Sequence, residues 1–439
     1  MIHSLRALSV RNYRLYAAGA LVSNLGTWMQ RIGQDWVVLQ LTDNSGVAVG
    51  VTTGLQFLPA LLLSPMAGVI ADRFPKRRLL QCTQLMMGIP SLLLGILAVT
   101  GAVRPWQVYV IAFVFGLGSA LDAPARQSFV PEMVDEELLT NAVAVNSVSF
   151  NGARMVGPAL AGGMISLLGG GSEAAGWTIL INAITYAPVI VALQLLDPAQ
   201  LKPPRRPRVR ERHQVLAGIR YVRDRPDLTL IFFVTMFSAT FGINFQLTSA
   251  LMATQVFHRS ADGFGAIGSM LAIGTFAGAV WATRRTTVTA KVVVAASLCF
   301  GIALAIGGFA PTYVVFLAWA PVIGLCTMTM VTSTQMTVQL FTPPEFRGRV
   351  TSLYVLLSQG GAALGAPVIG WIGQYLGPRW TLLVGGFVVV TASLAGSAVH
   401  RRITAGQPAS GADAPARPDV DDVPAPGKEA PSTGRKDAV

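Results

Sequence analysis

The stretch GVIADRFPKRR, residues Gly68–Arg78, decides how this chain is organised. It forms a short charged turn between two apolar runs, Val47–Ala71 and Leu79–Thr100. Its charged residues are Asp72, Arg73, Lys76, Arg77 and Arg78. Apolar runs of about 20 residues have the length of a bilayer crossing, and basic residues in short loops orient such crossings. The stretch therefore predicts a cytoplasmic turn that joins two transmembrane helices.

The composition agrees with a membrane protein. The 439 residues are 52% hydrophobic and 12% charged, whereas a soluble domain has about 25% charged residues. The net charge of +12 is spread over alternate loops, so we interpret it as a signal of membrane topology and expect no nucleic-acid partner. Cys82, Cys299 and Cys326 lie far apart inside apolar runs, so we expect no disulfide framework, no metal site and no cofactor.

Twelve apolar runs have the length to cross the membrane, and we expect an all-α membrane fold. The predicted spans are Tyr13–Leu41, Val47–Ala71, Leu79–Thr100, Trp106–Ala125, Asn141–Leu168, Trp177–Leu196, Leu228–Phe257, Gly263–Thr283, Lys291–Phe309, Tyr313–Leu340, Val350–Leu376 and Trp380–Val399. The spans form two six-helix halves, residues 1–196 and 228–399. A basic linker with an amphipathic helix, residues 197–227, connects them, and a disordered tail follows at 400–439.

Charge in the loops predicts the orientation. The loops on the side of the two termini hold 19 lysine and arginine residues, whereas the opposite loops hold only Arg104, Arg259 and Arg379. Basic loops stay in the cytoplasm. We therefore expect a multi-pass protein of the cell membrane, in contact with the lipid bilayer, with both termini and the linker in the cytoplasm.

An internal repeat relates the two halves. Three glycines of the fifth span recur with the same spacing in the eleventh span, 208 residues later. The pairs are Gly157 with Gly365, Gly162 with Gly370, and Gly169 with Gly377. Gly26 and Gln30 of the first span likewise match Gly242 and Gln246 of the seventh. Two parallel repeats about an axis along the membrane normal are typical of one class of transporter.

These residues resemble the major facilitator superfamily. GVIADRFPKRR is similar to its loop motif between spans two and three, and ARMVGPALAGG, residues 153–163, is similar to its antiporter motif in span five. The first motif matches at Gly68, Asp72, Arg73, Lys76 and Arg78. The second matches at Gly157, Pro158, Gly162 and Gly163, and close helix packing alone would use the same residue types.

Further stretches resemble the branch that contains enterobactin exporters and macrolide efflux proteins. They are GTWMQ (Gly26–Gln30), DAPARQSFVPEMV (Asp122–Val134), GIRYVRDRP (Gly218–Pro226) and FRGRV (Phe346–Val350). The resemblance covers roughly residues 5–399. It implies two pseudo-symmetric six-helix bundles around a central cavity, and export of a small amphipathic molecule, either a drug-like compound or a siderophore.

The charged turn is also a candidate gate. In the family, the carboxylate at Asp72 holds the inner ends of the two halves together, and helix N-termini attract anions. The N-terminus of the eleventh span, with Arg347 and Arg349 beside it, is the expected acceptor. The alternative is that these charges only anchor the topology.

Three ionisable residues inside spans are candidates for ion coupling. Asp35 and Arg31 are four residues apart, so they share a helix face, and Arg154 lies deep in the fifth span. Ionisable residues in a bilayer usually face a cavity and a partner. Asp35 could bind and release a proton with Arg31 beside it, or the two could be a permanent structural ion pair. Arg154 could attract an anionic substrate, or it could bond to a neighbouring helix near Asn151.

Polar and aromatic residues inside the spans are candidates for the cavity wall, since such side chains stack on and hydrogen-bond to ligands. They are Asn24, Trp28, Gln30, Gln34, Asn146, Asn151, Asn244 and Gln246. No GxxxxGK[ST] nucleotide motif is present, so we expect a proton-driven antiporter and not an enzyme. An importer of a small nutrient and a non-transporting membrane sensor or scaffold remain alternatives.

Overall fold

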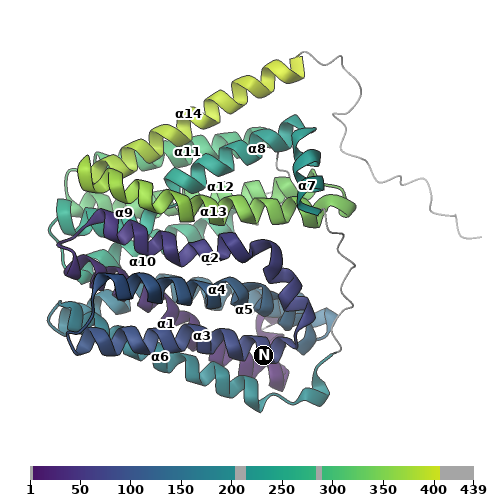
Figure 1. The fold of residues 1–439 in the computed structure, drawn as a ribbon. Helices are drawn as coiled ribbons and strands as arrows, with labels where there is room; N and C mark the ends of the chain where they lie inside the picture. The colour runs from purple at the N-terminus through teal and green to yellow at the C-terminus, as the bar shows by residue number, and fades with distance from the viewer. Residues whose placement is uncertain (1–2, 203–213, 283–288, 406–439) are drawn as a thin grey trace, which may run out of the picture.

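The computed structural model describes residues 3–202, 214–282 and 289–405, and they form an all-helical protein (Figure 1). The first group of elements is η1 His3–Ser9, α1 Arg11–Leu41, α2 Gly46–Arg73, α3 Lys76–Val99, α4 Pro105–Met133, α5 Glu136–Leu167 and α6 Ser172–Leu195. The connecting elements are η2 Pro198–Gln200 and α7 Gln214–Arg223. The second group is α8 Pro226–Phe237, η3 Ser238–Gly242, α9 Phe245–Leu251, η4 Met252–Val256, α10 Ala261–Ala282, α11 Ala290–Gly308, α12 Tyr313–Leu340, α13 Pro344–Tyr375 and α14 Pro378–Ala405.

Hydropathy assigns most of the described helices to the membrane. Ten segments are long and apolar enough to cross it, and α8 through η4 count as one of them. Two further helices, α1 and α5, have 31 and 32 residues but carry more polar and charged side chains. These two helices carry Arg31, Asp35 and Arg154. The all-α membrane fold is therefore confirmed, and the least apolar spans are those with the candidate coupling residues.

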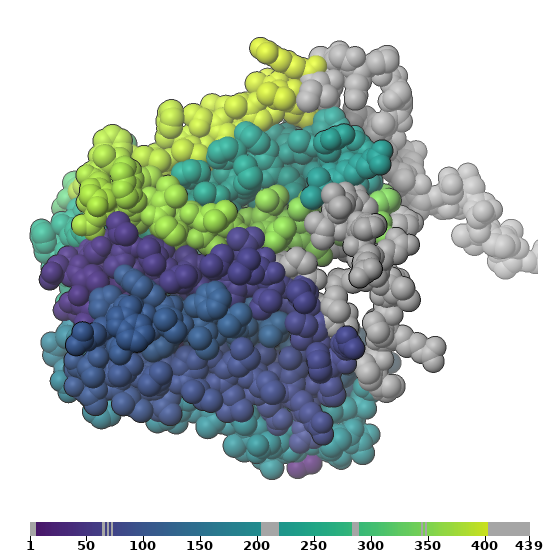
Figure 2. Space-filling view, in the orientation of Figure 1, coloured from purple at the N-terminus to yellow at the C-terminus, as the bar shows by residue number. Residues whose placement is uncertain are grey.

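The helices pack as two groups that lie side by side (Figures 1 and 2). Within the first group, α1 packs on α5 and α6, and α4 on α2 and α3; within the second, α12 packs on α10 and α11, and α14 on α11. The most extensive contacts between the groups are those of α2 with α13 and of α5 with α10. We call the end of the molecule where α1 begins and α14 ends the terminus side, and the opposite end the far side.

Glycines bring the two groups into close contact on the far side. A Cβ added to Gly370 of α13 would lie 3.1 Å from the Cα of Gly50 in α2. At the second seam, a Cβ on Gly265 of α10 would lie 3.1 Å from the Cα of Gly162 in α5. Carbon atoms prefer separations of about 3.5–4.0 Å, so only glycine allows these helices to approach so closely.

Hydrogen bonds between the groups add to the closure of the far side. The backbone N–H of Gly46 donates to Oε1 of Gln374 at 2.7 Å, and Nε2 of Gln255 donates to the carbonyl of Asn44 at 2.6 Å. These bonds join the start of α2 to α13, and the loop before α2 to η4. The far side is therefore closed by both packing and polar contacts.

The seventh span is not the single helix predicted over Leu228–Phe257. It consists of α8, η3, α9 and η4, and both η segments are π-helical. In these wider turns the N–H of Ile243 donates to the carbonyl of Ser238, and that of Phe257 to Met252, each at 3.0 Å. Such π-turns often occur at functional sites, and the interruption at residues 243–244 here borders the cavity described below.

The linker and the tail differ in part from expectation. A helix, α7, lies within residues 197–227, with Val222 buried and Ile219 45% exposed. The Tyr221 ring stacks on Phe346 of α13, with ring centroids 4.6 Å apart, so α7 packs on the second group. The helix α14 continues to Ala405, past the predicted tail start at residue 400, and its last turns contain the polar residues His400, Arg401 and Arg402. The rest of the predicted tail and the proline-rich stretch 203–208 lie outside the described residues.

Candidate functional site

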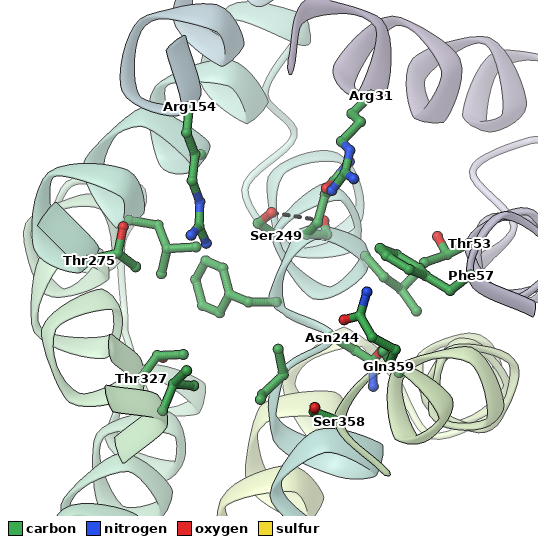
Figure 3. Close-up of a pocket in the computed structure, with 18 of the residues that line it drawn as sticks. Arg31, Thr53, Phe57, Arg154, Asn244, Ser249, Thr275, Thr327, Ser358 and Gln359 are labelled. Atoms are coloured by element: carbon green, nitrogen blue, oxygen red, sulfur yellow. Dashed lines mark hydrogen bonds between the residues drawn. The ribbon is translucent and has the colours of Figure 1, made fainter. Parts of the chain in front are cut away.

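A central cavity of about 420 Å³ lies between the two helix groups (Figure 3). The first group contributes side chains from α1, α2 and α5, and the second from α8, α9, α10, α12 and α13. The apolar part of the wall includes Phe57, Phe245, Phe264, Leu271 and Met330. The neutral polar part includes Thr53, Asn244, Gln246, Ser249, Thr275, Thr327, Ser358 and Gln359. A mostly apolar cavity of this size with a few polar groups suits a drug-sized amphipathic ligand.

The cavity continues toward the terminus side. A second cavity, of about 460 Å³, lies between α2, α4 and α13 and shares Arg31, Phe57, Val355 and Gln359 with the first. Its wall reaches Ala67 near the end of α2. Together with the closed far side, this arrangement gives a chamber whose continuation leads to one end of the molecule only.

Trp28 and two arginines form the centre of the wall on the side of α1 and α5. The Cζ of Arg31 lies 4.6 Å from the Trp28 ring centroid, and that of Arg154 lies 5.3 Å from it. Arg31 also lies over Phe57 at 5.5 Å. These are cation–π distances, which fix the guanidinium groups on aromatic faces. Both arginines project into the cavity (Figure 3), so both predicted coupling arginines lie in its wall.

Gly157 of the antiporter-like motif allows Trp28 to sit there. A Cβ added to Gly157 would lie 2.7 Å from the Cβ of Trp28, a separation that no relaxed structure allows. Phe150 packs edge-on against the same ring, with centroids 5.8 Å apart. Of the other motif residues, Pro158 lines the cavity, Gly162 forms the far-side seam, and a Cβ on Gly163 would meet nothing within 4 Å.

Asp35 does not pair with Arg31. Its carboxylate is 3% exposed, and its Oδ2 accepts a hydrogen bond of 2.7 Å from Nε2 of Gln246 in α9. Neither Arg31 nor Arg154 forms an ion pair with a carboxylate of the described chain. The interpretation of Asp35 and Arg31 as a permanent ion pair is therefore wrong. The carboxylate instead joins the two helix groups near the far side.

Three of the eight predicted cavity residues line the cavity, namely Trp28, Asn244 and Gln246. The remaining five, Asn24, Gln30, Gln34, Asn146 and Asn151, are not in its wall. Gln30 bonds within the first group, to Asn182 and to the Ser91 hydroxyl at 2.5 Å. Gln34 donates to Oε1 of Gln56 at 3.3 Å, and Asn151 donates to the Ser147 carbonyl at 2.8 Å. Their helices rotate these amides toward neighbouring helices or the chain's own backbone.

Asp122 is a second buried carboxylate that the sequence placed at a span edge. It lies within a continuous helix, because α4 continues to Met133, eight residues beyond the predicted end at Ala125. Its Oδ1 accepts from the Thr83 hydroxyl at 2.8 Å and from Nε2 of Gln84 at 2.7 Å, and its Oδ2 pairs with Arg126. The spacing of four between Asp122 and Arg126 was the sequence signal for this pair.

The charged turn is described only in part. Lys76 forms an ion pair of 2.5 Å with Glu132, which ties the start of α3 to the end of α4 within the first group. Arg73 and Arg78 are exposed, and the Arg349 guanidinium lies 5.4 Å from the Phe346 ring centroid. Gly68 and the side chains of Asp72 and Arg347 lie outside the part described in atomic detail. The gate at Asp72 stays a prediction.

Comparison with known proteins assigns the family. The model of the transmembrane secretion effector family, MFS_3, matches residues 3–421. The chain belongs to this family. It is therefore a transporter of the major facilitator class and not an enzyme, and the predicted relationship to the enterobactin-exporter and macrolide-efflux branch is confirmed.

Individual relatives cover most of the chain. The staphyloferrin A transporter of Staphylococcus aureus is 27% identical, over 86% of this chain and 94% of that protein. The multidrug efflux pump Tap of Mycolicibacterium fortuitum is 25% identical, over 83% and 90%. The enterobactin exporter EntS of Citrobacter koseri is 23% identical, over 82% and 84%. The fold is similar to that of a bacterial homologue of the lysosomal transporter Spinster, solved inward-facing and unoccupied. The TM-score is 0.70 at 14% identity, and the match covers 90% of this chain and 98% of that chain.

Proposed function

We propose that this transporter exports an amphipathic small molecule, a drug-like compound or a siderophore, from the cytoplasm by alternating access. The observation that carries the proposal is a chamber that is closed on the far side and continues toward the terminus side. The excess of basic residues in the terminus-side loops favours a cytoplasmic location for that side. The chamber then has the form of a loading state, in which a ligand enters from the cytoplasm.

Export requires the far side to open while the terminus side closes. The two glycine seams, Gly50 with Gly370 and Gly162 with Gly265, must separate in that step. In the closed arrangement the bond from Gln246 to Asp35 crosses the same boundary. Separation breaks this bond and exposes the carboxylate to water on the far side. This supports a role for Asp35 in proton antiport, since it would exchange protons with the outside only when the far side is open.

The relatives support the same direction of transport. The related proteins include one named as a multidrug efflux pump and one named as an enterobactin exporter. The cavity suits such ligands because its wall contains both aromatic or aliphatic side chains and hydroxyl or amide groups. The two substrate classes both remain within the proposal.

The test uses inverted membrane vesicles from cells that make the protein. We expect at least one of three dyes, fluorescein, Nile red or rhodamine 123, to accumulate in energised vesicles, and an uncoupler to abolish the accumulation. Vesicles that lack the protein give the background. Net loss of dye from preloaded vesicles would indicate import, and no movement of any dye would refute the proposed export.

A further inference from the structure

The two cavity arginines point to a property of the ligand. We propose that the substrate carries a carboxylate or a similar planar oxyanion, which binds to Arg31 and Arg154 beside Trp28. The inference rests on the proposed export function and adds the charge of the substrate to it.

The charge balance of the cavity is the first argument. Among the described residues that line the two cavities, Arg31 and Arg154 are the only charged ones. The nearest carboxylate on the same helix is Asp35, which accepts its hydrogen bond from Gln246. Even if Asp35 balances one guanidinium across a helical turn, one positive charge is left over. The wall of the chamber is therefore electropositive.

The hydrogen bonding of Arg31 is the second argument. Its Nε is buried and has no hydrogen-bond partner in the described structure. A buried charged donor without a partner is unfavourable, so an oxyanion bound beside the guanidinium group offsets the cost of burying its charge. Guanidinium groups present a planar fork of N–H donors, which matches the two oxygens of a carboxylate. An ammonium or a neutral hydroxyl ligand offers no such match.

The support behind the arginines is the third argument. Both guanidinium groups rest on Trp28, Gly157 leaves room for the Cβ of that residue, and Phe150 packs edge-on against its ring. Side chains held in this way bind a ligand without first losing much freedom of rotation. The two arginines thus form a prepared site and not a pair of free surface charges.

The part of the wall that the second helix group forms indicates the rest of the ligand. There α9, α10 and α12 contribute Phe245, Phe264 and Met330. The polar groups of this part are neutral, for example Thr275 and Asn244, which Figure 3 labels. The site therefore suits a molecule with an anionic end toward α1 and α5 and an apolar or aromatic body toward the second helix group.

A pair of xanthene dyes of opposite charge tests this. Fluorescein carries a carboxylate, whereas rhodamine 123 has a similar ring system and a positive charge. We measure the anisotropy of each dye with the full-length protein in nanodiscs of zwitterionic lipid. We expect fluorescein to bind about tenfold or more tightly than rhodamine 123.

Variants then locate the effect. Replacing both arginines, Arg31→Gln with Arg154→Gln, should weaken fluorescein about tenfold or more and leave rhodamine 123 unchanged or tighter. Arg154→Lys keeps the charge and should retain most of the preference. Arg402→Gln removes an exposed charge at the end of α14 and should change nothing. A selective loss of fluorescein binding, with rhodamine 123 binding retained, is a result that a merely misfolded variant does not give.

The contrary outcomes are distinct. Equal binding of the two dyes, no binding of either, or a preference that survives the double substitution would overturn the anion site. Export of the neutral dye Nile red separates this failure from a failure of the proposed function. If Nile red is exported while the charge preference is absent, only the anion site is wrong.

Discussion

The α5–α10 seam gives the sharpest prediction. A Cβ on Gly162 would lie 3.1 Å from the Cα of Gly265, and the reverse substitution meets Gly162 Cα and the Pro158 carbonyl carbon, each at 3.1 Å. Overpacking of this kind costs about 1–3 kcal/mol. The cost applies only while the far side is closed, because opening separates α5 from α10. Gly162→Ala or Gly265→Ala should therefore shift the equilibrium toward far-side opening about 5- to 150-fold.

Cysteine labelling from outside intact cells measures this shift. Ser249 lines the cavity, so Ser249→Cys serves as the reporter once the three native cysteines are replaced by alanine. A membrane-impermeant maleimide should react slowly with the parent and faster with Gly162→Ala or Gly265→Ala. In the double variant the free-energy shift toward opening should be smaller than the sum of the two single shifts, because the two positions share one contact.

Gly163→Ala is the matched control. A Cβ there meets nothing within 4 Å, although the residue is adjacent to Gly162 in the same helix. If Gly163→Ala accelerates labelling as much as Gly162→Ala does, the seam is not the cause. Unchanged labelling in both seam variants would refute the claim that this contact holds the far side closed.

Three further predictions concern charged residues. Asp35→Asn should remove the uncoupler-sensitive part of dye accumulation in inverted vesicles, and unchanged accumulation would exclude Asp35 from coupling. Lys76→Met leaves Glu132 buried without its partner and should lower the free energy of unfolding by about 3–5 kcal/mol. Lys202→Met removes one partner of the exposed pair with Asp135 and should lower it by about 0–1 kcal/mol. Thermal unfolding measures both changes. Asp72→Asn should cut transport without reducing the amount of protein in the membrane, and full transport would count against the gate.

The fold was predictable from the sequence because bilayer-length apolar runs are a strong signal. The runs around Gly68–Arg78 gave α2 and α3 close to their observed bounds. The end of α4 was harder. Asp122 and Arg126 resemble a loop in composition. Inside the helix group they pair with each other, and Asp122 also accepts hydrogen bonds from Thr83 and Gln84, so α4 continues past them.

The site was predictable only in part. Trp28, Gln30 and Gln34 lie in the same helix within two turns, yet only Trp28 faces the cavity. Which amide points inward depends on the rotation of α1 against α3 and α6, and Gln30 is turned away by its bonds to Ser91 and Asn182. A single sequence does not specify that rotation when every face of a helix contacts either lipid or another helix.

The interruption of the seventh span has a mechanical consequence. The short segment α9 carries Gln246, the partner of Asp35, and π-turns bound it at η3 and η4. Sharp bends in helices occur at π-turns of this kind. The segment can therefore tilt as a short lever and release Asp35 while α8 keeps its place, so the first event of opening needs no movement of an entire bundle.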